Sequence, residues 1–477
     1  MSNRPLILLF VSLCFLFSCS APKRTTTTIE PATPVIERTL PPLPESRINI
    51  PVKVAMSPLI EKMEAVTAKQ FTSDKWPDYF QSSCDFRYKY RFLRSPFTFT
   101  CVNNVVNIGF QGHYQIAGSK TVCAFNKQLS PWISGSCGFG NEPLRKVDLA
   151  ITSILEMLPR HQLRTTTRLS KLNALDKCQV SLLQTDVTTE VMDSIRVSVE
   201  SYCTTFDEFV QGINDFSVLD KWRRNSSPVL PIMKYGFLNL NPTFFRIGKF
   251  NYNRDTLYFS VGFHGKPAFA SDSLVLATAT PLPALISMDQ PAGIATWLHA
   301  AYDYQFLSSL LNDSLRNKPF EVDGKTFVIR NVLLAGTADN KIQVEVAFDG
   351  FKKGTLRLSG TPVLDTATQV LSMPDISFSL DSRDMLLNIA KGLFRKKIMK
   401  QLKDQSVFDI GALIEKHKES IAARLNQPVN TWLQTKGDLQ SLRIIGLLPR
   451  KDVIELQVYI QGTLTLIGAP PAGLLAF

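Results

Sequence analysis

Hydrophobic and polar residues alternate along most of the chain after residue 47. A period of two is typical of β-strands that bury one face. In the segment 86–92 (FRYKYRF), aromatic side chains fall on one face and Arg87, Lys89 and Arg91 fall on the other. The alternation is clearest in four segments: 86–92, 257–263, 342–348 and 454–460. The pattern therefore predicts a body built mainly from antiparallel strands.

Several of these strands are expected to end alike, with a glycine two residues after the last inward apolar side chain. Glycine at such a position suits a β-bulge or a turn at the end of a strand. The glycines concerned are Gly112, Gly265, Gly350 and Gly462. We expect them to shape large, curved antiparallel sheets.

Helical spacing stands out in a few places only. The first helix is expected to begin at Ser57 as its cap, with Pro58 in the first turn. A second and longer helix is expected to begin near Thr188, because apolar residues recur there every three or four positions. Its apolar face consists of Val191, Ile195, Val199, Tyr202, Phe206, Val210 and Ile213.

Two further helical regions are predicted in the second half of the chain. One follows Asp303, with a buried stripe of Phe306, Leu307, Leu310 and Leu311. The other runs from about Asp384 to Asn426, with a break near Asp404.

The chain has the pattern strand–helix–sheet–helix twice. The strand and helix in residues 48–66 have a counterpart in residues 294–315, although few residues are identical. The body is also longer than one hydrophobic core usually serves. We therefore predict an α+β fold with two modules, residues 47–285 and residues 286–477.

The first residues have the pattern of an export signal. Arg4 precedes an apolar run, 5–17, that is too short to span a bilayer as a permanent helix. Its end, LFSC, resembles the lipobox of bacterial lipoproteins. This resemblance implies that residues 1–18 are removed and that Cys19 is acylated, which would attach the protein to a membrane through its N-terminal acyl chains. The alternative is an ordinary secretory signal.

Residues 20–46 are rich in threonine and proline and contain no aromatic residue. Such a segment cannot bury enough surface to fold, so residues 19–46 are predicted to be the lipidated cysteine and a disordered tether. In enteric bacteria an aspartate after the lipidated cysteine marks retention in the inner membrane. Ser20 stands there instead, so the analogy favours the outer membrane of a Gram-negative cell envelope. No later apolar segment is long enough to span a membrane.

The formal net charge is +12. In an exported protein this favours acidic lipid headgroups or envelope polysaccharides as partners, and not nucleic acid. Basic residues gather in 391–403 (KGLFRKKIMKQLK), whose apolar residues share one helical face. This helix could lie on an anionic membrane surface, or it could pack on a sheet with its basic side in solvent. The candidate membrane-surface residues are Lys391, Arg395, Lys396, Lys397 and Lys400.

Six cysteines follow Cys19, all in the first half of the chain: Cys84, Cys101, Cys123, Cys137, Cys178 and Cys203. An even set in an exported chain indicates three disulfides, for which fifteen connectivities are possible. Pairing of nearest neighbours is our prediction: Cys84–Cys101, Cys123–Cys137 and Cys178–Cys203.

No motif in the sequence points to catalysis, a metal or a cofactor. The turn GSCGFG, residues 135–140, is followed by a turn and a strand, whereas a phosphate-binding loop needs a following helix. The histidines lie apart, and no GxSxG, HExxH or CxxC occurs. A few aromatic residues are candidate platforms for sugars, although such residues are more often part of a core: Trp76, Tyr79, Phe80, Trp132, Trp297 and Trp432.

Four segments resemble an uncharacterised family of bacterial envelope lipoproteins, catalogued as domain of unknown function 4403. They are SRINIPVKVAMSPLIEKM, SCGFGNEP, LNLNPTFF and IELQVYIQGTLTL. The doubled layout also resembles the tubular lipid-binding superfamily, which includes bactericidal permeability-increasing protein. That resemblance implies two tandem modules, each a highly curved antiparallel sheet wrapped around long amphipathic helices, with acyl chains in the apolar gap.

These observations lead to the hypothesis of a non-catalytic envelope protein that binds or carries a lipid or another long apolar ligand. The alternatives are a structural or glycan-binding surface lipoprotein with a packed interior, and an envelope hydrolase. The candidate lipid-contacting residues are Val191, Ile195, Val199, Tyr202, Phe206, Phe306, Leu307, Leu310 and Leu311.

Overall fold

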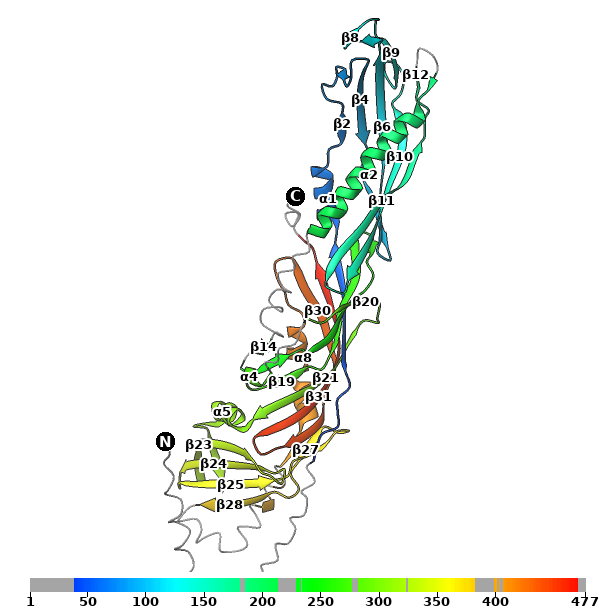
Figure 1. The fold of residues 1–477 in the computed structure, drawn as a ribbon. Coiled ribbons are helices and arrows are strands. Elements are labelled where there is room, and N and C mark those ends of the chain that lie inside the picture. The colour runs from blue at the N-terminus through cyan, green and yellow to red at the C-terminus, as the bar shows by residue number, and fades with distance from the viewer. Residues whose placement is uncertain are drawn as a thin grey trace, which may run out of the picture. The chain divides into compact units, whose positions relative to one another are not determined.

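A computed structural model describes residues 38–180, 185–212, 229–232, 234–276, 282–322, 325–381, 399–400, 403 and 406–470. Most of these residues form β-strands (Figure 1). The helices among them are α1 (Ser57–Val66), α2 (Thr188–Gly212), α4 (Ser273–Leu276), α5 (Tyr304–Leu315) and α8 (Ile410–Arg424). The chain from Leu40 onward forms one compact unit.

One sheet of 19 strands contains most of the body. Its long strands are β1 (Ser46–Ala55), β4 (Phe86–Arg94), β6 (Val105–Lys120), β10 (Arg145–Leu158), β11 (Gln162–Ala174), β18 (Thr256–Gly265), β21 (Gly293–Asp303), β30 (Leu433–Pro449) and β31 (Val453–Gly468). Its shorter strands are β2 (Gln70–Thr72), β3 (Phe80–Gln81), β5 (Thr98–Val102), β9 (Ile133–Cys137), β14 (Val229–Pro231), β15 (Phe237–Asn239), β16 (Pro242–Ile247), β17 (Asn251–Asn253), β19 (Ala268–Ala270) and β20 (Leu285–Ser287).

The other strands form smaller sheets. A five-stranded sheet consists of β22 (Pro319–Val322), β23 (Lys325–Gly336), β24 (Ile342–Gly350), β25 (Gly354–Gly360) and β28 (Ser377–Asp381). A three-stranded sheet consists of β26 (Val363–Asp365), β27 (Val370–Ser372) and β29 (Val407–Asp409). Two hairpins are formed by β7 (Cys123–Ala124) with β8 (Lys127–Gln128) and by β12 (Gln179–Val180) with β13 (Thr185–Asp186).

Strand β1 joins parts of the chain that are far apart in sequence. One edge pairs with β18 along its whole length. The other edge pairs first with β21, at Arg47–Asn49, and then in parallel with β31, at Val52–Val54. Pro51, which has no N–H to donate, falls between these two partners, where it costs no hydrogen bond with either.

The side chain of Ser46 completes the pairing where β1 begins. Its hydroxyl donates to the carbonyl of Trp297 (3.1 Å) and accepts from the N–H of the same residue (2.9 Å). Ser46 is fully buried, so both bonds satisfy groups that water cannot reach.

The predicted fold class is wrong in its main feature, because the sheets do not wrap around helices. The described helices lie on the sheets, and α2 lies along one face of β6, β10 and β11 (Figure 1). Helices α1 and α8 have no buried residue at all. An apolar stripe needs only one covered side, so the helical spacing in the sequence did not require an enclosing sheet.

The helix boundaries agree with the sequence in part. Helix α5 begins after Asp303, whose carboxylate accepts from the N–H of Phe306 (2.7 Å). Helix α1 contains Ser57, but Met56 occupies the cap position and no side chain caps the helix. Of the fourth predicted region, α8 lies within the described residues and 382–398 lies outside them. The division at residue 285 stays a prediction; strands from both sides of it belong to the 19-stranded sheet.

The expected glycines have two different roles. Gly265 and Gly350 end their strands, and Gly350 has a positive φ of 118°. Gly112 and Gly462 lie inside β6 and β31. A Cβ at Gly112 would lie 2.2 Å from the ring of Phe92, so glycine there permits close packing.

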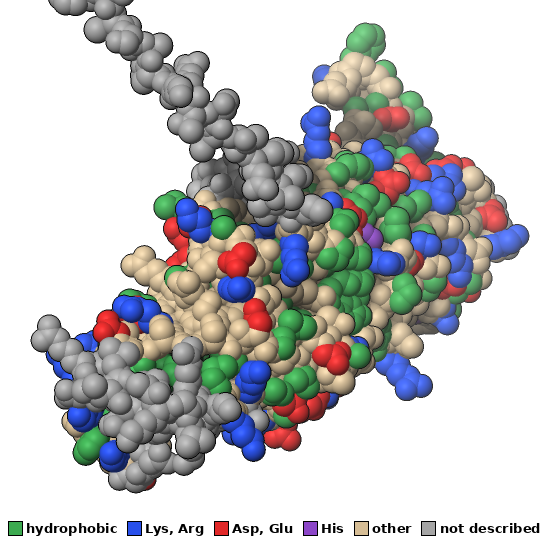
Figure 2. All heavy atoms as spheres, turned by 90° about the horizontal axis from the view of Figure 1, so that it is seen from below, with side chains coloured by type: hydrophobic (Ala, Val, Ile, Leu, Met, Phe, Trp, Pro, Cys, Tyr) green, Lys and Arg blue, Asp and Glu red, His purple; other side chains and the backbone are tan. Residues whose placement is uncertain are grey.

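On the face drawn in Figure 2, basic and acidic side chains are interspersed and hydrophobic side chains lie between them. Within the described part of the chain, no helix is both long enough and apolar enough to cross a membrane.

The predicted disulfide pairing is wrong. The structure joins Cys84 to Cys123 and Cys137 to Cys178, and it leaves Cys101 and Cys203 as buried thiols. Each bridge joins residues about 40 positions apart, which only the fold brings together, so spacing along the chain does not reveal the pairing.

Among the six cysteines from Cys84 to Cys203, peptide mapping without reduction should find these two bridges and two free thiols. Burial raises the pKa of the thiols of Cys101 and Cys203, so both should react slowly with alkylating agents until the protein unfolds. Each disulfide, if unstrained, should stabilise the fold by about 4 kcal/mol through loop closure. The measurement is the free energy of unfolding of the oxidised protein compared with that of the reduced protein. A bridge that contains Cys101 or Cys203 would contradict the prediction.

Candidate ligand cavity

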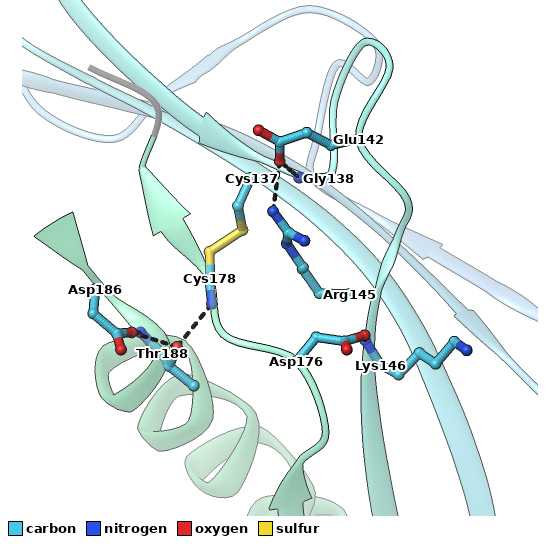
Figure 3. Close-up of a disulfide and its surroundings, with 9 residues drawn as sticks. All are labelled: Cys137, Gly138, Glu142, Arg145, Lys146, Asp176, Cys178, Asp186 and Thr188. Carbon is cyan, nitrogen blue, oxygen red and sulfur yellow. Dashed lines mark hydrogen bonds and ion pairs between the residues drawn. A yellow bond between two sulfur atoms is a disulfide. The ribbon is translucent and has the colours of Figure 1, made fainter. Parts of the chain in front are cut away.

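The Cys137–Cys178 disulfide fixes the start of α2 against the sheet. Cys137 ends β9, and Cys178 lies ten residues before Thr188, the first residue of α2 (Figure 3). The N–H of Cys178 donates to the Thr188 hydroxyl (2.8 Å), and the N–H of Thr188 donates to the carboxylate of Asp186 (3.0 Å). The bridge and the first turn of the helix are therefore one connected unit.

A turn on the other side of the disulfide is held by Glu142. Its carboxylate accepts from the N–H of Gly138 (2.9 Å) and from the guanidinium of Arg145 (2.7 Å), as Figure 3 shows. Gly138 has a φ of 75°, a conformation that favours glycine. The segment GSCGFG is thus the end of a strand and a tight turn beside a disulfide.

The disulfide belongs to a hydrophobic cluster. Its buried members are Tyr114, Cys137, Val147, Leu149, Cys178 and Met192. From the predicted stripe of α2, Val191, Ile195 and Val199 pack against this cluster. The first half of α2 therefore faces the sheet as the sequence predicts.

A cavity of about 430 Å³ lies beside the cluster, between the first turns of α2 and strands β4, β6 and β9. Its walls are mainly apolar: Phe86, Tyr88, Ile116, Ile133, Val180, Val187 and Val191. Gly118 and Gly135 also line it, and a Cβ at Gly135 would lie 1.9 Å from Val180. The absence of a side chain at Gly135 thus lets the 178–180 segment approach the sheet.

Few polar groups reach this cavity. Ser119 and Ser134 bond to each other through their hydroxyls (2.6 Å), which leaves little demand for a polar ligand group there. Lys120 and Glu190 contribute one charge of each sign to the lining, and both residues are exposed. The chemistry of the cavity is therefore that of a binding site for an apolar group, with charges where it meets solvent.

The second half of α2 departs from the predicted stripe. Tyr202 and Phe206 are exposed, at 71% and 44%, and the buried positions are Cys203 and Val210. Asp207, on the same side as these two, accepts from the hydroxyls of Thr165 and Thr167 (both 2.6 Å) and from the N–H of Thr167 (2.8 Å). A carboxylate bound to β11, and not an aromatic side chain, fixes this end of the helix.

Burial alone would raise the pKa of Asp207, but the hydrogen bonds from Thr165 and Thr167 outweigh burial and lower the pKa below its ordinary value. The folded protein therefore favours the charged carboxylate.

A second cavity, of about 610 Å³, lies between α5 and the five-stranded sheet. From α5 it is lined by Gln305 and Ser308, and not by the predicted Phe306, Leu307, Leu310 and Leu311, which are half-buried. Glu345 and Arg357, an ion pair at 2.8 Å, also line it. It is thus the more polar of the two cavities.

Helix α5 is attached to β23 by polar side chains. Asn312 donates to the carbonyl of Val332 (2.7 Å) and accepts from the N–H of the same residue (2.8 Å). The hydroxyl of Ser308 accepts from the N–H of Leu334 (2.8 Å). Strand β22 pairs with β23 only as far as Val328, so the helix satisfies the strand edge beyond that point.

The outer face of β4 carries a row of cations that contact aromatic rings. Arg87 lies over Tyr79 and Trp132, 4.6 and 4.4 Å from the ring centroids. Lys89 lies 4.7 Å from the centroid of Tyr79, and Arg91 lies 5.7 Å from that of Trp76. The candidate sugar platforms Trp76, Tyr79 and Trp132 thus each have a cation over the ring.

The remaining candidates are placed as follows. Cys19, Lys391, Arg395, Lys396 and Lys397 lie outside the described residues, and Lys400 is exposed. Within the described residues, no three His, Cys, Asp or Glu side chains are close enough together to hold a metal ion. The sequence did not reveal Ser194, Gly135 or Val180 as cavity residues, because only the fold brings them together.

A family model described as "Domain of unknown function (DUF4403)" matches residues 44–467, and the chain belongs to this family. The family resemblance in the sequence is confirmed. No curated protein matches the chain. A crystal structure of lipopolysaccharide binding protein is similar at 11% identity with a TM-score of 0.21, over 88% of this chain and 98% of that chain. A likeness this weak carries no argument about ligand or mechanism.

Replacement of Asp207 by alanine should destabilise the protein by about 1–3 kcal/mol, because three donors on β11 would lose their acceptor. Chemical unfolding at neutral pH measures this loss. Glu208→Ala is the matched control, since Glu208 is the next residue and is exposed.

The effect should depend on pH. The pKa of Asp207 is lower in the folded than in the unfolded protein, so its contribution is present above the ordinary carboxyl pKa of ~4 and is lost as the pH falls through the folded value. A difference between wild type and Asp207→Ala that stays constant down to the acid end of the folded range would contradict this role.

Proposed function

We propose that the protein binds a lipid or another long apolar ligand, without catalysis, in the cavity between α2 and strands β4, β6 and β9. The observation that supports this most directly is the cavity itself, whose walls are apolar and whose volume is about 430 Å³. Ligand pockets in proteins commonly measure ~300–1,000 Å³ and are lined mainly by apolar side chains.

The surroundings of the cavity favour a preformed site. The disulfide and the hydrogen bonds of Thr188 fix one wall, and a packed cluster forms the base. A site that is held open before the ligand arrives loses less conformational entropy on binding. Lys120, at the solvent side, suits an acidic headgroup on the ligand.

Filling the cavity from the helix should abolish binding while the fold is retained. Ser194 lines the cavity, and its hydroxyl donates to the carbonyl of Glu190 (2.9 Å). In Ser194→Phe the new ring would occupy the space of the ligand. We expect at least a tenfold loss of affinity for a fluorescent fatty-acid probe, which corresponds to ~1.4 kcal/mol.

Ser198→Phe is the matched control. Ser198 lies one turn further along α2 and makes the same kind of hydrogen bond (3.1 Å, to the carbonyl of Ser194), but unlike Ser194 it does not line the cavity. Thermal unfolding of both variants shows whether either change harms the fold. If wild type and Ser194→Phe take up the probe equally, or if wild type takes up none, the cavity is not a lipid site and the structural or glycan-binding alternative becomes the better account.

We further propose that Cys19 is the point of lipid attachment and that the tether holds the body near the outer membrane. The support is the order of signal, lipobox-like end and threonine-proline segment in the sequence. Cells fed labelled palmitate should label the wild-type protein and not Cys19→Ala. Cys14→Ala, in the same apolar run, should label as wild type does. Continued labelling of Cys19→Ala would disprove this attachment.

A further inference from the structure

The hairpin β7–β8 exposes large hydrophobic side chains. Its turn contains Phe125 and Asn126, both with positive φ (51° and 58°). A bulky residue rarely adopts this conformation, and Phe125 is also completely exposed, at 100%. The turn thus directs a phenylalanine into solvent, at a cost in backbone conformation and without any contact that would explain it.

Phe125 does not stand alone. Val122, Leu129 and Ile133 belong to the same segment and are 60–65% exposed. We call residues 120–133 the tip segment. Single exposed apolar residues are ordinary on protein surfaces, but several of them within one short segment mark a surface that contacts something apolar.

The tip segment is anchored firmly. The Cys84–Cys123 disulfide ties the hairpin to the residues before β4. The Ser130 hydroxyl accepts from the N–H of Val122 (2.9 Å), and Thr121 donates to the Ser130 carbonyl (2.5 Å). A rigid hairpin presents its apolar side chains without losing much conformational entropy when they are buried.

The charges around these side chains are mostly positive. Lys120 and Lys127 are exposed, and the sequence from 120 to 141 contains no acidic residue. Arg87, held over Trp132, lies beside the tip segment. Asp85 interacts electrostatically with Lys120, and Glu190 lines the cavity with it, but the tip segment itself contributes two lysines and no carboxylate. Apolar side chains surrounded by lysine and arginine complement the interface of an anionic bilayer.

The tip segment is also continuous with the cavity. Ile133 and Lys120 both belong to the tip segment and both line the cavity. The tip segment and the cavity therefore share residues.

We propose that the tip segment docks on an anionic phospholipid membrane, with Phe125 and Leu129 in the apolar layer and Lys120 and Lys127 at the headgroups. The docking does not require the cavity to hold a lipid, so the two proposals can fail separately.

The test is a difference measurement on the full chain. Phe125→Trp adds a fluorophore at the tip segment, and wild type supplies the background from the native tryptophans. Vesicles of phosphatidylcholine with brominated chains, with and without phosphatidylglycerol, are the probe. We expect the added fluorescence to shift to the blue and to be quenched in vesicles that contain phosphatidylglycerol. Leu274→Trp, in α4, is the control, because Leu274 is 79% exposed and distant in sequence.

A double variant tests the contribution of charge. In the Phe125→Trp background, the double change Lys120→Gln and Lys127→Gln should remove most of the preference for phosphatidylglycerol. The Phe125→Trp variant that keeps both lysines should lose the same preference at high salt. Absence of quenching at residue 125, or equal quenching at residue 274, would overturn the docking. Self-association that Phe125→Ser abolishes, without any quenching by lipid, would assign the tip segment to a second copy of the chain and overturn it as well.

Discussion

The pairing of β1 with strands from three distant parts of the chain is the constraint on which the rest of the structure depends. Its register with β18 fixes one edge, and β21 and β31 share the other. A shift by one residue would turn every side chain of β1 to the opposite face and would disturb all three partners at once. Arg47 opposite His264, and Val52 opposite both Phe259 and Leu466, are positions of this single register.

At three places a polar side chain completes a strand where a neighbouring strand is missing. Ser46 bonds both backbone groups of Trp297, and Asn312 does the same for Val332. The buried Gln369 donates to the carbonyl of Ile444 (3.0 Å) and accepts from its N–H (2.8 Å), beside a register shift in β30. In each case one side chain substitutes for a strand residue. Buried backbone groups need partners, and this arrangement supplies them without another strand.

The sequence predicted what depends on local spacing. Alternation identified the strands around Tyr88 and Val344, and Asp303 identified the start of α5. It did not predict that Asp207 would face the sheet in place of Phe206, because the reason lies in Thr165 and Thr167, about 40 residues away. The sequence did not predict the disulfide partners or the cavity residues, for the same reason. Both depend on contacts among β4, β6, β9 and the start of α2, and these contacts leave no local pattern in the sequence.

The position of β1 has a consequence for the order in which the protein is made. β1 emerges from the ribosome early, but the residues of β31 that pair with it emerge about 400 residues later, which takes roughly 20–80 s at ordinary rates of synthesis. During that interval β1 has an unpaired edge, which is a template for aggregation. Arg47, Pro51 and Lys53 are residues of the kind that protect such edges. These residues therefore limit aggregation of β1 before its partner strands are made, and they are also compatible with its place in the finished sheet.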